Sequence, residues 1–153
     1  MKKLILSLFL MGLVASAVPG ATVPGEKPIQ FSLALSGGGF WPDTSDARTI
    51  IGPGARVDFN LGKWIIFAPE VTLGLGGTTL GGTLNLRYGG LFAGAGGGIV
   101  YFWGDEQEVG AVAVVKLQAG FKSRSWIVTG AYMSDSLPAG WFYGFQGSIG
   151  YIF

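Results

Sequence analysis

The chain contains no cysteine and no histidine. It therefore cannot form the disulfide framework of a stapled secreted domain, and it cannot build a Ser-His-Asp or Cys-His catalytic arrangement. Phosphate-binding motifs are missing as well, because the glycine runs at 37–39 and 94–98 complete neither a G-x-G-x-x-G nor a P-loop pattern. We expect a protein without catalytic activity, cofactor or metal.

Charge is also scarce. Only 12% of the residues are charged and 49% are hydrophobic, whereas an average protein is about one quarter charged. The uncharged segments at 71–86 and 137–153 are broken repeatedly by Gly, Thr, Gln or Pro, so neither is typical of a membrane helix. A chain that is apolar enough for lipid but not helical favours a closed β-barrel, because hydrocarbon does not tolerate open sheet edges.

The first residues are typical of a secretory signal peptide. A basic start, Met1-Lys2-Lys3, precedes an apolar stretch and the small-residue site Ala15-Ser16-Ala17. The apolar stretch is shorter than the roughly 20 residues that a membrane helix needs. Loss of Lys2 and Lys3 changes the formal charge from +1 to −1, and nothing indicates a nucleic-acid partner. The expected organisation is a signal peptide at 1–17, a periplasmic leader at 18–28 and a barrel at 29–153.

Eight segments alternate between large apolar residues and small or polar ones. A period of two indicates β-strands, and eight is the smallest even strand number in single-chain bacterial barrels. The expected fold class is therefore all-β, an eight-stranded antiparallel up-and-down transmembrane β-barrel. Its predicted strands are about 29–36, 49–61, 65–75, 79–88, 91–102, 109–121, 126–133 and 141–153.

The connections fall into two sets, tight turns and longer loops, as in barrels whose short turns face the periplasm. The tight turns are predicted at 62–64, 88–90 and 122–125, and the longer loops at 37–48, 102–108 and 134–139, with 76–78 as a short member. Amphipathic rings prefer membrane interfaces, and two bands are expected: Trp41, Tyr101, Trp103, Trp141 and Tyr143 at the outer rim, and Trp64, Tyr88, Trp126, Tyr151 and Phe153 at the inner one. Six carboxylates in the longer loops predict a solvated acidic rim or, alternatively, sites that bridge lipopolysaccharide through divalent cations: Asp43, Asp46, Asp105, Glu106, Glu108 and Asp135.

Charged residues inside the strands are expected to face the lumen, because a lipid-facing Arg or Lys costs about 2–4 kcal/mol at the bilayer midplane. A turn at 62–64 places Arg56 opposite Glu70, and a turn at 77–78 places Asn85 beside Glu70. Pro69 predicts a bulge that would shift the first of these registers by one residue. The predicted luminal polar network comprises Arg56, Asp58, Glu70, Asn85, Arg87 and Lys116. It serves as charge compensation within a plug or, alternatively, as a gated ion or proton path.

The last segment, 141–153, alternates through thirteen residues and ends on an aromatic residue. Because of this ending, the strand count and the loop asymmetry, the chain resembles the small outer-membrane barrels of the OmpX, OmpW and OmpA-barrel type. In such proteins the barrel-assembly machinery reads a final polar-x-Gly-x-x-aromatic-x-aromatic pattern. Gln146, Tyr151 and Phe153 match this assembly signal, and Ser148 stands at the glycine position. The resemblance implies a porin-like protein of the Gram-negative envelope, surrounded by outer-membrane lipid and lipopolysaccharide.

The function expected from these features is non-enzymatic, with a structural or envelope-protective role and a lumen filled by side chains. One alternative is OmpW-like binding or transport of small hydrophobic molecules, for which Gly94, Gly96 and Gly98 leave room for a slender cavity. For the glycine runs as such, close strand packing is preferred over a phosphate-binding loop. A second alternative is an adhesin-like surface protein that uses Phe40 and Trp41 of the 37–48 loop. At the level of fold, the alternative is a soluble lipocalin-like barrel with the two faces exchanged.

Overall fold

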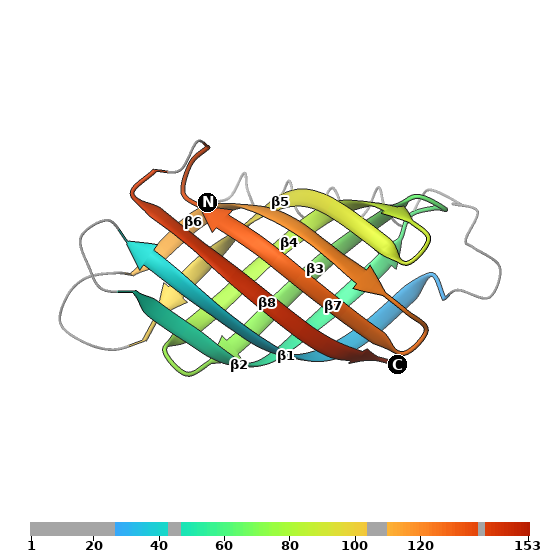
Figure 1. Ribbon diagram of the computed structural model, residues 1–153, viewed down its shortest axis with the longest axis horizontal. Coiled ribbons are helices and arrows are strands. Elements are labelled where there is room, and N and C mark those ends of the chain that lie inside the picture. Colours follow the sequence, from blue (N-terminus) through green and yellow to red (C-terminus); the bar gives the residue numbers. More distant parts are fainter. Residues whose placement is uncertain (1–26, 43–46, 104–109, 138–139) are drawn as a thin grey trace, which may run out of the picture.

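The computed structural model describes residues 27–42, 47–103, 110–137 and 140–153. Eight antiparallel strands form a closed barrel, and sequence neighbours are spatial neighbours throughout, which confirms the expected up-and-down fold (Figure 1). The predicted signal peptide and most of the leader lie outside the described residues. The strands are β1 Ile29–Pro42, β2 Arg48–Asn60, β3 Ile65–Gly74, β4 Gly77–Tyr88, β5 Leu91–Phe102, β6 Ala111–Lys122, β7 Trp126–Ser134 and β8 Phe142–Ile152.

The described residues include no helix that is long and apolar enough to cross a membrane.

The barrel closes where β1 pairs with β8. Stepping from Ile29 through the paired residue on each successive strand leads back to β1 at Gly39, ten residues further along. This stagger means that the strands cross the barrel axis obliquely, as Figure 1 shows. Eight tilted strands enclose a cross-section that side chains alone can fill.

Two ends of the barrel can be distinguished. The near end carries the first residue of β1, the last residue of β8 and the tight connections between β2 and β3, β4 and β5, and β6 and β7. Gly89 in the second of these turns has φ +59°, a left-handed conformation that glycine adopts without strain. The far end carries Pro42, Gly77, Phe102 and Phe142.

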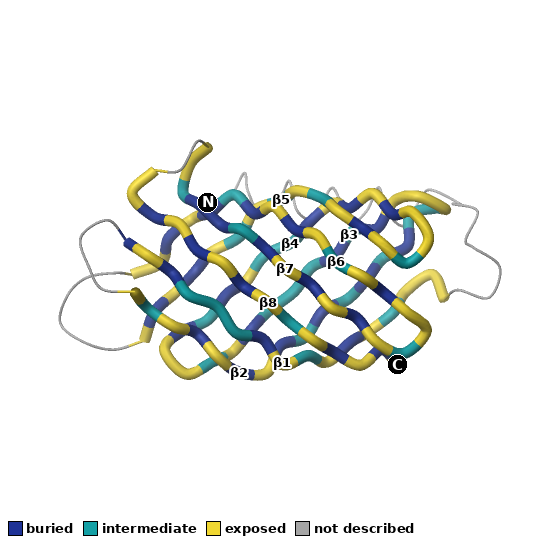
Figure 2. The backbone as a smooth tube through the Cα atoms, viewed as in Figure 1, coloured by how far each residue is buried: buried dark blue, intermediate teal, exposed yellow. Residues whose placement is uncertain are grey.

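Burial alternates along most of each strand, which appears as alternating dark and yellow segments in Figure 2, and the alternation is interrupted by short half-buried runs in β1 and β3. The inward positions hold all the charged strand residues together with small, polar and buried apolar ones, whereas every described outward strand position holds an uncharged residue. The ten ring residues expected in two bands are all exposed at the strand ends or next to them. Rings on neighbouring strands touch within each band, as Trp41 does with Tyr143 at 5.6 Å and Trp64 with Tyr88 at 6.1 Å between centroids.

Three predictions about strand boundaries and pairing are wrong: the loop at 37–48, the turn at 77–78 with its pairing of Glu70 and Asn85, and the bulge at Pro69. β1 continues through the glycine run to Pro42, so the loop expected at 37–48 is mostly strand. The turn between β3 and β4 lies at Leu75-Gly76, where Gly76 takes φ +85°, and Glu70 therefore faces Gly81 rather than Asn85.

No bulge forms at Pro69. The β2–β3 ladder omits the pairs that would involve Ala68 and Pro69, yet the register is the same on both sides of the gap. Arg56 therefore stays directly opposite Glu70, as the turn at 62–64 predicts. Because proline has no N–H to donate, the ladder loses hydrogen bonds here without gaining a residue.

Candidate functional site

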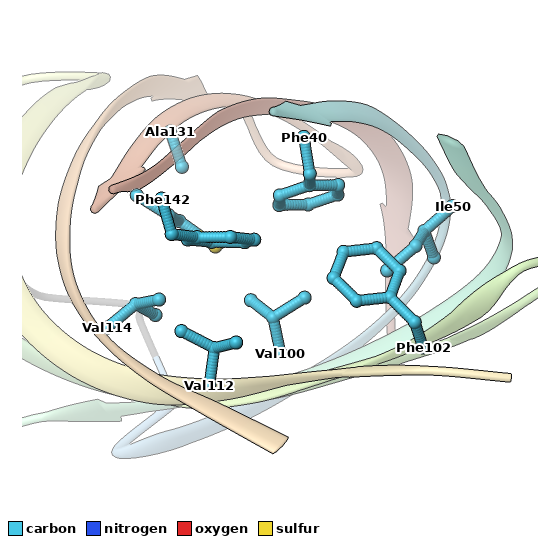
Figure 3. Packing of buried hydrophobic residues seen from close by; sticks show 9 residues of the cluster. Phe40, Ile50, Val100, Phe102, Val112, Val114, Ala131 and Phe142 are labelled. Carbon is cyan, nitrogen blue, oxygen red and sulfur yellow. The ribbon is translucent and has the colours of Figure 1, made fainter. Parts of the chain in front are cut away.

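The lumen of the far half of the barrel is filled by apolar side chains. Phe40, Phe102 and Phe142 lie ring against ring, with centroid separations of 5.8 to 6.1 Å. Phe40 and Phe142 come from the neighbouring strands β1 and β8, and Phe102 reaches them from β5 on the other side of the barrel, as Figure 3 shows. We call this group the aromatic plug, and its other members are Ile50, Val100, Val112, Val114, Ala131 and Met133.

The inward glycines of β5 are required by close strand packing. A Cβ placed on Gly94 or Gly96 would lie 2.1 or 1.9 Å from a carbonyl oxygen of β4, and one on Gly98 would lie 2.5 Å from another. Real Cβ atoms do not approach backbone atoms this closely, so the glycines let the wall bend tightly. Close strand packing is therefore confirmed as the explanation of these residues, and Gly98 also lines a cavity of only about 10 Å³ beside Lys116.

On the near-end side of the aromatic plug, Glu70 on β3 is the centre of a polar cluster. Its carboxylate accepts hydrogen bonds from Lys116 Nζ and from Gln118 Nε2 at 3.0 Å, and it forms an ion pair with Arg56 Nη1 at 3.6 Å. The side chain of Lys116 is 3% exposed and that of Glu70 is 17% exposed. The buried ammonium thus has a carboxylate beside it, which offsets the large cost of removing a charge from water.

Arg56 connects this cluster to a second carboxylate. Its Nε donates to Asp58 Oδ1 at 2.6 Å, and Asp58 Oδ2 accepts from Lys122 Nζ at 2.6 Å. The guanidinium also stacks on the ring of Phe92, with 4.9 Å between Cζ and the ring centroid. Cations and carboxylates therefore alternate across the lumen, an arrangement that lets each charge be partly neutralised by its neighbours.

Gln118 extends the cluster toward β4. Its Oε1 accepts from Arg56 Nη1 at 3.0 Å and from Thr83 Oγ1 at 2.9 Å, and Thr83 in turn accepts from Asn85 Nδ2 at 2.9 Å. Asn85 is therefore connected to Glu70 through two intervening side chains rather than directly. Arg87, which is also buried, donates from Nη2 to the carbonyl oxygen of Lys63 in the near-end turn at 3.2 Å.

The structure thus brings Arg56, Asp58, Glu70 and Lys116 together, and it adds Gln118, Thr83 and Lys122 to them. The predicted network lacks Lys122 because the sequence places this residue in the turn at 122–125, whereas β6 continues through it. Its parity with Lys116 could have revealed it, because residues an even number of positions apart on a strand share a face. We use luminal network for the group Arg56, Asp58, Glu70, Thr83, Asn85, Lys116, Gln118 and Lys122.

Little space remains among these side chains. A polar cavity beside Arg56 has a volume of about 20 Å³, and a second beside Lys116 about 10 Å³. A larger void of about 520 Å³ is a shallow groove on the outer surface between Leu117, Tyr132 and Phe145, not a chamber inside the barrel. The part of the chain that the structure describes holds no group of three His, Cys, Asp or Glu residues suited to a metal ion. Five of the six carboxylates of the predicted acidic rim, all except Asp135, lie outside the described residues.

No protein-family model and no curated protein sequence matches the chain. Among solved structures, the N-terminal β-barrel domain of OprF from Pseudomonas aeruginosa matches with a TM-score of 0.51 and 12% sequence identity, over 81% of this chain and 97% of that domain. Ail, the attachment invasion locus protein of Yersinia pestis, matches with a TM-score of 0.47 and 13% identity, over 84% of this chain and 100% of that protein. The chain thus shares the fold of the small eight-stranded outer-membrane barrels, as the sequence predicts.

Proposed function

We propose that the protein is an integral outer-membrane β-barrel with a closed lumen, without catalytic activity, and with a structural or envelope-protective role. The observation that carries this proposal is the division of the strand residues between the two faces of the wall. Every charged side chain of the described strands points into the lumen. The outward face is apolar between two aromatic bands.

The outward face supports insertion into lipid rather than a soluble barrel. In a soluble lipocalin-like barrel the apolar residues would line the interior, and the charged residues would meet water outside. Here Leu84 and Leu86 on β4 are 55% and 69% exposed, whereas Arg87 beside them is 7% exposed. This arrangement is favourable in a hydrocarbon environment, because leucine side chains are stable in contact with lipid whereas a lipid-facing arginine is costly.

The filled interior supports a structural role over transport. A pocket for a small molecule usually exceeds roughly 300 Å³, and the luminal cavity beside Arg56 holds about 20 Å³. The aromatic plug occupies the far half, where an OmpW-like ligand would enter. The adhesin-like alternative loses one of its two aromatic residues, because Phe40 is completely buried in that plug.

Insertion would place the near end at the periplasm and the far end outside the cell, with lipid and lipopolysaccharide around the wall. Tyr151 and Phe153 are exposed in the near-end band, where the barrel-assembly machinery could contact them, whereas the Gln146 side chain points into the lumen. We expect removal of Phe153 to slow assembly in cells without lowering the stability of barrels refolded in detergent. Equal loss in both settings would contradict a role as assembly signal for this residue.

The decisive experiment combines membrane fractionation with gel mobility before and after boiling. A membrane barrel is expected in the outer-membrane fraction and migrates differently when unheated. Purified protein in planar bilayers should then show no steady conductance, because the lumen is closed. Protein in the soluble fraction, with mobility unchanged by boiling, would refute the membrane proposal, and a stable open pore would refute the closed lumen.

A further inference from the structure

A small polar cavity lies inside the barrel between the luminal network and the wall formed by β1, β7 and β8. Its volume is about 20 Å³, and roughly 10–15 Å³ suffices for one water molecule. The polar side chains that line it include Ser32, Ser36, Arg56, Glu70, Thr129 and Gln146.

Two of these side chains carry a buried polar atom without a protein partner. Arg56 Nη2 is a donor and Gln146 Oε1 is an acceptor, and the two residues are 5% and 7% exposed. Their other polar atoms are bonded: Arg56 Nε and Nη1 to Asp58 and Gln118, and Gln146 Nε2 to Thr72 Oγ1 at 3.0 Å. Buried donors and acceptors are almost always satisfied by protein or by ordered water.

We propose that this cavity is a binding site for one ordered water molecule. The water accepts a hydrogen bond from Arg56 Nη2 and donates one to Gln146 Oε1. Its second hydrogen is available to Ser32 Oγ, which already donates to the Arg56 carbonyl oxygen, and the Ser36 hydroxyl is available as a further donor. A single water can do both because it donates twice and accepts twice. It joins the luminal network to the separate bonded group of Gln146, Thr72 and Thr79.

The chemistry of the lining favours water over the other small occupants. A halide ion accepts hydrogen bonds but cannot donate them, so it would leave Gln146 Oε1 unsatisfied. The two cations that line the cavity, Arg56 and Lys116, are already paired with Asp58 and Glu70. An apolar occupant would satisfy neither orphaned atom, and the volume excludes anything larger than a few heavy atoms. Water is the occupant that satisfies both the donor and the acceptor.

The test uses the full-length mature protein, refolded in lipid nanodiscs and labelled with ¹⁵N. Magnetisation transfer from water should reach the side-chain N–H groups of Gln146 and Arg56. Ala34 lines the cavity from β1, so Ala34→Val should displace the water and abolish the transfer at both groups. The matched control is Ala93→Val, which adds the same atoms on the outward face of β5 and should leave the transfer unchanged.

A crystal structure of the unaltered protein, with a bromide soak, gives a second readout that does not depend on any variant folding. A density peak within hydrogen-bond distance of both orphaned atoms, without anomalous signal, supports the proposal. Anomalous bromide scattering at that position would assign the site to an anion and overturn it. Absence of both the peak and the water transfer, or transfer that persists in Ala34→Val, would also overturn it.

Discussion

Replacement of Glu70 by glutamine tests whether charge pairing holds the lumen together. The substitution keeps the size and the hydrogen-bonding oxygen of the side chain but removes its charge. Lys116, whose side chain is 3% exposed, then lacks the carboxylate to which its Nζ is bonded. Removing one partner of a buried ion pair costs about 3–5 kcal/mol, and the 17% exposure of Glu70 argues for the lower end. We therefore expect a loss of about 3 kcal/mol in the free energy of unfolding.

Removing the other partner of this ion pair should lower the free energy of unfolding much less. Lys116→Met removes the buried ammonium and keeps an unbranched stem, while Glu70 retains its bond to Gln118 and its ion pair with Arg56. Replacing a buried charge by an apolar group of similar volume is often close to neutral, so we expect a loss of about 1 kcal/mol or less. The double variant Glu70→Gln/Lys116→Met should match Lys116→Met alone, because no unpaired ammonium remains.

The assay is urea unfolding of the refolded barrel in lipid vesicles, followed by tryptophan fluorescence and by gel mobility without boiling. With an m-value of about 2 kcal/mol per molar, Glu70→Gln should lower the midpoint by roughly 1.5 M. The control is Asp135→Asn at the far end, where the new side-chain oxygen can still accept from the Phe142 N–H. The reasoning is refuted if Glu70→Gln is no worse than this control, or if adding Lys116→Met fails to restore stability.

Three other substitutions test the plug, the wall and the outer face. Phe142→Ala should cost about 3–5 kcal/mol in unfolding free energy by leaving a cavity among the three rings, and bilayer recordings should then show openings that the parent lacks. Gly96→Ala puts a Cβ 1.9 Å from a backbone oxygen and should reduce the heat-modifiable gel fraction, whereas Gly130→Ala meets nothing within 4 Å and should not. Leu84→Arg should cost about 2–4 kcal/mol in vesicles; an unchanged urea midpoint would mean that this face does not lie in hydrocarbon.

The alternation of residue types was sufficient to predict the strands and the direction in which their side chains point. The inward direction of Arg56, Glu70 and Lys116 follows from the period of two, because a charged side chain on the outward face would be too costly. The register between β2 and β3 could also be predicted, because the turn at 62–64 has few residues and leaves little choice. Arg56 lies opposite Glu70 for that reason.

The register between β3 and β4 could not be predicted in the same way. Gly74, Gly76 and Gly77 offer several places for a turn, and each accepts the backbone conformations that turns require. The observed turn differs from the predicted one by a shift of four residues in the pairing of Glu70. An even shift leaves every side chain on its own face, so the apolar pattern is equally satisfied by both registers.

The extension of β1 was missed for a related reason. Gly37, Gly38 and Gly39 have no side chains, so the alternation that identifies a strand is invisible there. Phe40 and Trp41 continue it, one completely buried in the plug and the other exposed in the far-end band. A glycine run between two correctly phased segments is thus compatible with strand as well as with loop, and close approach to β8 favours strand here. A Cβ on Gly38 would lie 2.7 Å from the carbonyl oxygen of Phe145.

The luminal network distinguishes between strand registers that the apolar outward face leaves equivalent. Thr83 on β4 bonds to Gln118 on β6, which also bonds to Arg56 on β2 and Glu70 on β3. A slip of β4 by four residues would move Thr83 roughly 13 Å along its strand, at about 3.3 Å per residue, and would break this connection. The leucines of β4 would still face outward after such a slip. Buried polar contacts across the lumen therefore discriminate between registers that the apolar outward face leaves equivalent, which is a structural reason for this barrel to retain charges inside.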